Sequence, residues 1–296
     1  LVCQPDKPAG RGGPLTAPPV KELAEQLGLP VIQPKSARTG ELRDALAASG
    51  AELAIVVAYG KILPKDVLEA LPRGFINVHV SLLPKYRGAA PIQWAVIDGE
   101  TETGISIMQL DEGMDTGPVL LENKVAIDPA WTSGDLFEHL KTVAPLALQA
   151  ALLMIEQGRA RPQAQDHAQA THARMLTKAD GAIDFGEPAA KVAARIRGVD
   201  PWPGVQAVLR GQVVKLFRAR AAGGQGVLGI ASDARGAPGT VLAVDGDGAH
   251  VAAGDGIVVV RELQLPGKKR MPATQLVNGR ALAAGDVLTK PVLAAT

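Results

Sequence analysis

Cysteine is almost absent from this chain of 296 residues, because Cys3 is the only one. A disulfide within the chain is therefore excluded, and so is a zinc site built from cysteines. Both exclusions favour a cytoplasmic protein.

Long hydrophobic runs are also lacking. The most apolar stretch, Leu146–Ile155, is interrupted by Gln149 and is too short to cross a bilayer, so we expect no transmembrane segment and no membrane partner. No internal repeat is present, and the glycine-rich run Gly10–Gly13 lacks the strand–turn–helix context and the Lys-Ser/Thr pair of a phosphate-binding loop. The sequence opens at Leu1 as though already inside a strand, with no recognisable signal peptide, and we expect the natural protein to have more sequence upstream.

The length predicts about two domains, at roughly 150 residues per domain. Hydrophobic residues make up 47% and charged residues 21%, which is typical of a soluble globular protein. The net charge of +1 hides an asymmetry: residues 1–204 hold 20 Lys and Arg against 24 Asp and Glu, and residues 205–296 hold 11 against 6. A basic second part indicates a polyanionic partner such as nucleic acid, although a charge of this size is also common on ordinary solvated surfaces.

Strands and helices alternate in the first part of the chain. We expect strands at Leu53–Ala58, Phe75–Val80 and Gly104–Leu110, the first of them buried on both faces, with short helices between them. This alternation predicts an open, mostly parallel, doubly wound α/β sheet. Ligands of such sheets bind beyond the carboxyl ends of the strands.

The pattern changes in the second part. Arg159–Arg174 has little apolar periodicity and is interpreted as a linker, which a helix at Ala189–Arg197 follows. Beyond it, five or so short β-rich runs separated by Gly, Asp and Pro predict a small β-barrel of the OB type. The predicted divisions are a catalytic domain at residues 1–158, a linker and connecting helix at 159–204, and a C-terminal domain at 205–296.

Three polar residues lie where strands are expected to end. Asn77 and His79 are two residues apart and leave the same face of a strand, and Asp115 follows the next strand. An amide and an imidazole can stabilise negative charge on a carbonyl oxygen, and a carboxylate can fix the imidazole tautomer or accept a proton through water. No Ser or Cys lies in a nucleophile elbow, which favours direct transfer over a covalent intermediate. From the residues alone, a core histidine, a strand-end hydrogen bonder and a turn residue would explain the pattern equally well.

Motifs along the whole chain carry a family resemblance. The sequences N-V-H-V-S-L-L-P at Asn77–Pro84, Y-R-G-A-A-P-I at Tyr86–Ile92 and M-D-T-G at Met114–Gly117 resemble the signature of the folate-dependent formyltransferase superfamily. More narrowly, the chain resembles the family of methionyl-tRNA formyltransferases in four further stretches: Gln4–Gly12, Ala58–Pro64, Asp200–Gly204 and Gly267–Met271.

This resemblance implies roles for particular residues. Asn77 and His79 would bind and polarise the formyl group of 10-formyltetrahydrofolate, and Asp115 would orient His79 and manage protons. Folate would be a cosubstrate, with no metal required. The implied folate contacts are Ser81, Leu82, Leu83 and Pro84, together with Ala58, Tyr59, Gly60, Ile62 and Leu63.

The resemblance also implies a second substrate, the α-amine of methionine esterified to initiator tRNA. The loop Gln4–Pro19 would reach the tRNA acceptor end, and basic residues of the barrel would face the tRNA. The implied contacts are Lys7, Arg11, Lys21, Lys268, Lys269 and Arg270. By itself, the cluster at 268–270 is more typical of a solvated turn. We expect a monomer.

Two departures and two alternatives accompany the resemblance. The family begins with a further strand and helix of about thirty residues, central in a doubly wound sheet, that this sequence lacks, and Gly12-Gly13-Pro14 carries less positive charge than expected.

The alternatives are a formyltransferase acting on a UDP-aminosugar and a nonenzymatic nucleic-acid-binding protein. A glycinamide ribonucleotide formyltransferase lacks the β domain expected at residues 205–296.

Overall fold

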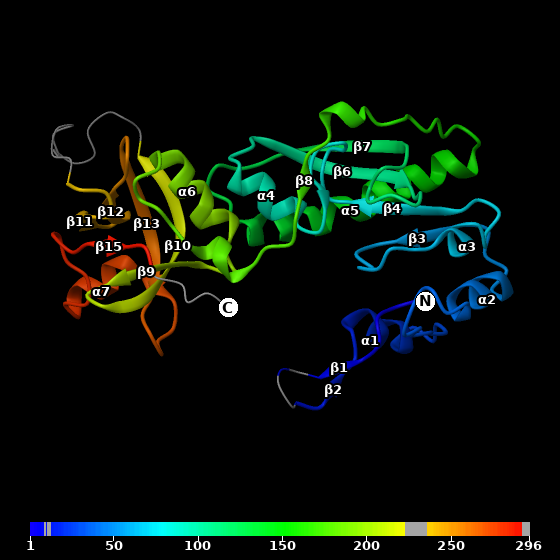
Figure 1. Ribbon diagram of the computed structural model, residues 1–296, viewed down its shortest axis with the longest axis horizontal. Helices are drawn as coiled ribbons and strands as arrows, with labels where there is room; N and C mark the ends of the chain where they lie inside the picture. The colour runs from blue at the N-terminus through cyan, green and yellow to red at the C-terminus, as the bar shows by residue number, and fades with distance from the viewer. Residues whose placement is uncertain (9, 11–12, 223–235, 292–296) are drawn as a thin grey trace. The chain divides into compact units, whose positions relative to one another are not determined.

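The computed structural model describes residues 1–8, 10, 13–222 and 236–291 (Figure 1). The chain forms two compact units. The first unit contains Leu1–His79, Ser106–Glu122 and Ala147–Ala170. The second unit contains Val80–Ile105, Asn123–Leu146 and the described part of Thr171–Thr296. The chain therefore passes between the units several times.

A four-stranded sheet has the order β3-β4-β6-β7, formed by β3 (Ala54–Val56), β4 (Phe75–His79), β6 (Glu102–Gln109) and β7 (Val119–Ala126). β3 and β4 are parallel, with Val56 opposite Asn77. β6 is antiparallel to β4, with Ser106 opposite His79. The α/β class predicted for this part is confirmed. The direction of β6 differs from the predicted parallel one. The connection after His79 re-enters the sheet at the end where β4 leaves it, so β6 runs back alongside β4.

The expectation that Leu53–Ala58 is buried on both faces is wrong. Only Ala54–Val56 forms a strand, and the side chains of Ile55 and Val57 are 45% and 61% exposed. Among the described residues, β3 pairs with β4 alone, so it is an edge strand. At the edge of a sheet, apolar side chains can be exposed to solvent even where the sequence pattern predicts a buried strand.

Short helices flank this sheet in the first unit. Proline at the first position starts α1, whereas Gly40 in a left-handed conformation (φ 77°) precedes α2. The apolar faces of α2 and α3 pack with Leu63, Leu71 and Phe75. The helices of the first part of the chain are α1 (Pro19–Gln26), α2 (Glu41–Ala48), α3 (Lys65–Leu68), α4 (Pro91–Ile97) and α5 (Ser133–Glu156), with a 3-10 turn η1 (His167–Gln169). In the described ranges, no helix has both the length and the apolar character needed to cross a membrane.

The second unit is built on an antiparallel sheet of seven strands. Its path is β11-β12-β13-β10-β9-β15, with β14 beside β13. The strands are β9 (Val205–Leu209), β10 (Gln212–Ala222), β11 (Val241–Asp245), β12 (Gly248–Ala252), β13 (Ile257–Gln264), β14 (Met271–Pro272) and β15 (Leu288–Thr289). The remaining elements are β5 (Arg87–Gly88), β8 (His172–Ala173), η2 (Lys178–Gly181), α6 (Ala189–Gly198) and α7 (Ala273–Asn278).

The two ends of this sheet meet, as the predicted barrel requires. The segment before β11 bonds to the segment before β15, where the Val241 amide donates to the Asp286 carbonyl and the Leu288 amide to the Gly239 carbonyl, both at 2.8 Å. Gly239 cannot carry a side chain here, because a Cβ would lie 2.1 Å from the Leu288 carbonyl oxygen. Helix α6 packs against β10 and contributes Val192 and Ile196 to the shared core (Figure 1).

Asp180 stabilises the chain before α6, and we expect the contribution to depend on pH. Its carboxylate accepts hydrogen bonds from Arg174 and from the amide and hydroxyl of Thr177. The bond from Arg174, together with those from the Thr177 amide and hydroxyl, lowers the pKa of Asp180 to about 2 against an opposing effect of burial. A lowered pKa means that the stabilisation is present above about pH 4 and is lost as the pH falls through about 2.

Asp180→Asn should therefore reduce the free energy of unfolding by about 2 kcal/mol at neutral pH and by progressively less in acid. Denaturant unfolding of both proteins between pH 7 and the lowest pH at which they stay folded measures the difference. A difference that does not change with pH would contradict the assignment.

Candidate active site

Strand β4 presents the two polar side chains that the sequence singled out. Its residues alternate between the faces of the sheet, so Asn77 and His79 share one face. His79 is only 5% exposed, and Asn77 is half-buried. β3 runs parallel to β4, so the chain after Val56 leaves the sheet at the same end of the strands as His79. The predicted placement of this pair at the carboxyl end of a strand is therefore what the structure contains.

Asp115 lies beside His79. Its Oδ1 is 3.7 Å from His79 Nδ1, within ion-pair range and longer than a direct hydrogen bond. Both side chains are largely buried, at 6% and 15% exposed. The carboxylate thus addresses one nitrogen of the imidazole ring and leaves Nε2 on the opposite side of the ring.

The route by which Asp115 reaches His79 differs from the sequence-based reasoning. That reasoning placed it after a parallel neighbouring strand, whereas β6 is antiparallel and ends beside Ile76. The loop after β6 instead folds back towards the carboxyl end of β4. Asp111, to which the sequence analysis gave no role, holds this loop: its Oδ1 accepts hydrogen bonds from the Gly113 amide (3.0 Å) and the Thr116 hydroxyl (2.6 Å). The Asp-x-Gly pattern of an Asx turn could have indicated this.

The predicted folate contacts that follow β3 differ in exposure. Ala58, Gly60 and Ile62 are exposed, and the Ile62 side chain is 60% exposed. Leu63, by contrast, is buried among the core residues of the first unit. The carbonyl of Tyr59 accepts a hydrogen bond from Gln4 at 2.6 Å, and the buried Tyr59 hydroxyl has no hydrogen-bond partner among the described residues. Burial raises the pKa of this hydroxyl.

The predicted contacts that follow β4 form a tight turn. Ser81 is completely buried, and its hydroxyl donates to the Lys85 carbonyl at 2.7 Å. Leu83 is buried, and Leu82 and Pro84 are half-buried. The peptide bond between Leu83 and Pro84 is cis. Ser81 therefore has a demonstrable role in closing the turn, while folate contact by this segment stays a prediction.

Of the predicted tRNA contacts near the N-terminus, Lys7 lies on a hairpin and Lys21 lies in α1. β1 (Lys7–Pro8) pairs with β2 (Leu15–Thr16), and the Lys7 side chain is exposed. The ammonium of Lys21 is bound by both oxygens of Asp6, at 2.9 and 3.1 Å, and Gln33 also donates to Asp6. Arg11 lies outside the described residues.

The basic cluster near the C-terminus divides into two kinds of residue. Lys268 and Lys269 are exposed in a turn after β13. Arg270 binds both oxygens of Asp200, each at 2.9 Å, and also Glu262, and its guanidinium lies 4.2 Å from the centre of the Phe217 ring. Its hydrogen-bonding groups are thus engaged within the second unit, so Arg270 is less suited to bind a polyanion than its two neighbours.

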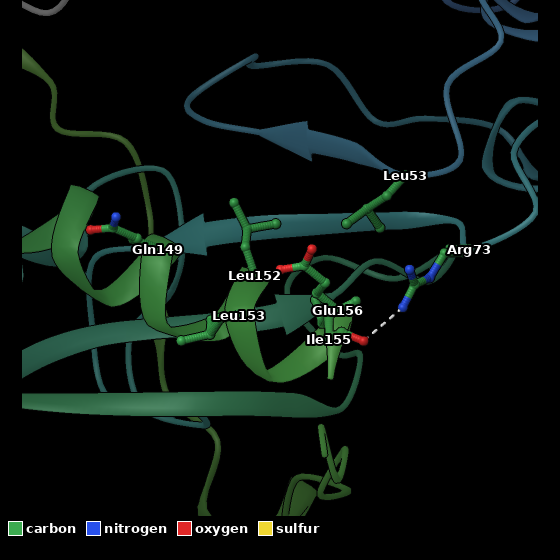
Figure 2. Close-up of a pocket in the computed structure, with 7 residues that line it drawn as sticks. All are labelled: Leu53, Arg73, Gln149, Leu152, Leu153, Ile155 and Glu156. Carbon is green, nitrogen blue, oxygen red and sulfur yellow. Dashed lines mark hydrogen bonds between the residues drawn. The ribbon is translucent and has the colours of Figure 1, made fainter. Parts of the chain in front are cut away.

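A separate hollow of about 430 Å³ lies in the first unit between the start of β3 and the end of α5. Figure 2 shows the Arg73 side chain at one side of it, donating to the Ile155 carbonyl at 2.9 Å. Its lining contains none of the predicted site residues; it consists of Leu53, Arg73, Gln149, Leu152, Leu153, Ile155 and Glu156. Across the described part of the chain, no group of three His, Cys, Asp or Glu side chains is placed to hold a metal ion.

Comparisons with known proteins identify the family and the fold of this chain. A sequence profile described as Formyl transferase matches residues 1–152, and one described as Formyl transferase, C-terminal domain, matches residues 175–281. An N-formyltransferase from Helicobacter canadensis, solved in complex with folinic acid and dTDP-3-aminofucose, has a TM-score of 0.65 and 14% identity, with 90% of this chain and 87% of that chain covered. The chain belongs to the formyl transferase family and is a transferase of one-carbon groups.

Within this family, the chain resembles particular proteins along nearly all of its length. Methionyl-tRNA formyltransferase of Desulfotalea psychrophila is 48% identical over 288 residues, which cover 97% of this chain and 87% of that protein. Methionyl-tRNA formyltransferase of Deinococcus radiodurans is also 48% identical, over 290 residues that cover 96% of this chain and 86% of that protein.

Proposed function

We propose that this chain transfers the formyl group of 10-formyltetrahydrofolate to the α-amino group of methionyl initiator tRNA, a step in translation initiation. The observation that carries this proposal is the juxtaposition of His79 and Asp115, with Asn77 on the same strand face. It occurs in a chain that is 48% identical, over 97% of its length, to a methionyl-tRNA formyltransferase. Folate serves as a cosubstrate.

The chemistry follows from the placement of the three side chains. The amine nitrogen of methionine attacks the formyl carbon, and the carbonyl π electrons move to oxygen. The Asn77 amide and a His79 N–H donate hydrogen bonds to that oxygen, where negative charge develops. The bond between the formyl carbon and N10 of the folate then breaks, and the proton lost by the amine is balanced by one gained at N10.

Asp115 supports this step through His79. In the doubly protonated ring that donates to the formyl oxygen, the Nδ1 proton faces the carboxylate 3.7 Å away, which limits rotation of the ring and directs the Nε2–H towards that oxygen. The pair excludes most water, because both side chains are largely buried, and hydrogen bonds to a developing oxyanion are stronger in such an environment. The carboxylate also offers a base for the amine proton, reached through a water molecule.

Folate binding is proposed for the segments that leave β3 and β4. Ala58, Tyr59, Gly60, Ile62 and Leu63 follow β3, and the exposed Ile62 offers apolar surface for a flat ring system. Ser81, Leu82, Leu83 and Pro84 follow His79 directly in the chain. The solved relative from Helicobacter canadensis contains folinic acid, which supports a folate site in this fold.

Binding of tRNA is proposed for the hairpin and for the turn after β13. Lys7 lies on the hairpin and Lys21 lies in α1, and Arg11, which falls outside the described residues, is included from the sequence alone. Lys268 and Lys269 offer exposed ammonium groups, which suit a phosphate backbone. We further propose that the protein acts in the cytoplasm as a monomer.

Charge reversal in this turn tests the proposed tRNA surface. The double variant Lys268→Glu/Lys269→Glu should weaken tRNA binding about tenfold. The slope of log K for tRNA binding against log[salt] should fall by an amount that corresponds to about one to two fewer ions released. Stability should change little, because both side chains are exposed. The matched control is Lys35→Glu/Lys65→Glu, two exposed lysines with the same change in net charge. Equal salt slopes for the two double variants would show that the turn does not contact tRNA.

One assay separates the proposed substrate from the alternative sugar substrate. The protein is incubated with formyl-labelled 10-formyltetrahydrofolate and either methionyl initiator tRNA or an amino-sugar nucleotide. We expect label on the tRNA alone. Label on the sugar alone would favour the sugar N-formyltransferases, and label on neither would contradict both assignments.

A further inference from the structure

The segment that leads from α5 towards β8 lies against the loop that carries Asp115. The main chains of Val119 and Gln163 are paired in both directions, with each amide 2.8 Å from the opposite carbonyl oxygen. Residues 153–174 lie outside both family profiles, which cover residues 1–152 and 175–281. The sequence predicts only a linker here, yet this part of it is joined to the active-site loop.

One side chain of this segment reaches the loop directly. Gln165 is only 8% exposed, and its Nε2 donates to the Asp115 carbonyl at 2.9 Å and to the Gly117 carbonyl at 2.7 Å. To donate to both carbonyl groups, this one nitrogen uses both of its hydrogens. Of the uncharged side chains, only Gln and Asn carry such a group, and Asn is one methylene shorter.

The main chain that Gln165 holds has an uncommon conformation. Asp115 has a φ of 54°, in the left-handed region that residues other than glycine seldom adopt. At Gly117 a Cβ would lie 2.0 Å from the Gln109 carbonyl oxygen, so the chain there passes very close to the end of β6. A conformation of this kind persists only where the surrounding contacts determine it.

We propose that Gln165 is a positioning residue, which aims the Asp115 carboxylate at His79 by fixing the carbonyl groups of Asp115 and Gly117. This inference rests on the proposed formyl transfer at His79 and Asp115. Loss of both hydrogen bonds frees the peptide unit between Asp115 and Thr116 and the one between Gly117 and Pro118, and the 3.7 Å approach of Asp115 to His79 Nδ1 is lost with them. A misplacement of about 1 Å in a catalytic group is enough to slow a reaction up to about 10²-fold.

A double-mutant cycle tests whether Gln165 acts through Asp115. Gln165→Met keeps the volume of the side chain and removes its donors, and Gln165→Ala removes the contact altogether. Each should lower kcat about tenfold, with KM for both substrates within about twofold of the original value. In an Asp115→Ala background, the same changes at Gln165 should lower kcat no further. A full additional loss in that background would overturn the proposal.

The control variant is Gln163→Ala. Its side chain is exposed, and its contact with Val119 is made by the main chain, so kcat should be unchanged. A tenfold loss in this control would show that the whole segment is sensitive and would overturn a specific role for Gln165.

A spectroscopic measurement keeps the test independent of the substrate. In the full-length protein, the ¹⁵N signals of the His79 ring report the partner of Nδ1 at a fixed pH. Gln165→Met should shift these signals in the same direction as Asp115→Ala, and an unchanged spectrum would overturn the proposal. A wild-type protein that formylates no tRNA would refute the proposed function, and the ring signals would still decide the role of Gln165.

Discussion

Replacing His79 with alanine is expected to lower kcat for formyl transfer by about 10²-fold or more. The imidazole supplies a hydrogen bond to an oxygen that becomes negative only as the reaction proceeds, so its loss raises the barrier more than it weakens binding of the substrates. KM for 10-formyltetrahydrofolate and for tRNA should therefore change much less than kcat. Steady-state assays with each substrate varied in turn measure both quantities.

The control for this experiment is His172→Ala. His172 has an exposed side chain in β8, and its loss should leave kcat unchanged. The fold should survive the change at His79, which thermal unfolding can verify. A His79→Ala enzyme with normal kcat would refute the proposed role, and one with normal kcat and a raised KM for folate would make His79 a binding residue only.

The residues of the site could be predicted from the sequence more reliably than the path of the chain between them. A period of two residues in a strand is a local property, so the common face of Asn77 and His79 follows from their spacing. The direction of β6 depends on where the connection after β4 re-enters the sheet, which no local pattern encodes. Asp115 therefore lies where the family resemblance placed it, although the parallel-sheet reasoning for its position was wrong.

Burial and pairing over long distances account for the remaining differences. The run Leu53–Ala58 is apolar enough for a central strand, yet its exposure depends on which other strands pair with β3. Gln165 lies in a stretch without periodicity, and its contact with a loop 48 to 50 residues earlier leaves no signal in the sequence. The second unit was easier to predict, because short β-rich runs separated by turns are typical of a closed antiparallel sheet.

Arg270 illustrates the same limit for charged residues. In the sequence it is one of three consecutive basic residues, but its partner Asp200 is 70 residues away and only 4% exposed. The main-chain carbonyl of Asp200 also accepts bonds from the Ser133 hydroxyl (2.7 Å) and the Gly134 amide (3.1 Å). Arg270, which directly precedes β14, therefore connects this strand to the loop before β9. The carbonyl of Asp200 connects the same loop to the start of α5.

Replacing Arg270 with alanine should lower the free energy of unfolding by about 3 kcal/mol, because the buried Asp200 carboxylate then loses the guanidinium that binds both of its oxygens. The loss of contact with the Phe217 ring adds to this effect. Lys269→Ala is the matched control, since this neighbouring residue is exposed, and it should change stability by no more than about 0.5 kcal/mol. Denaturant unfolding of the three proteins measures these differences.

A second variant separates the charge from the packing. Asp200→Asn in the Arg270→Ala background should recover part of the lost stability, because it removes the unbalanced charge that Arg270→Ala leaves buried. No recovery would assign the effect to lost packing against Phe217. An Arg270→Ala protein that is as stable as the original but binds tRNA weakly would instead make Arg270 a tRNA contact, as the family resemblance implies.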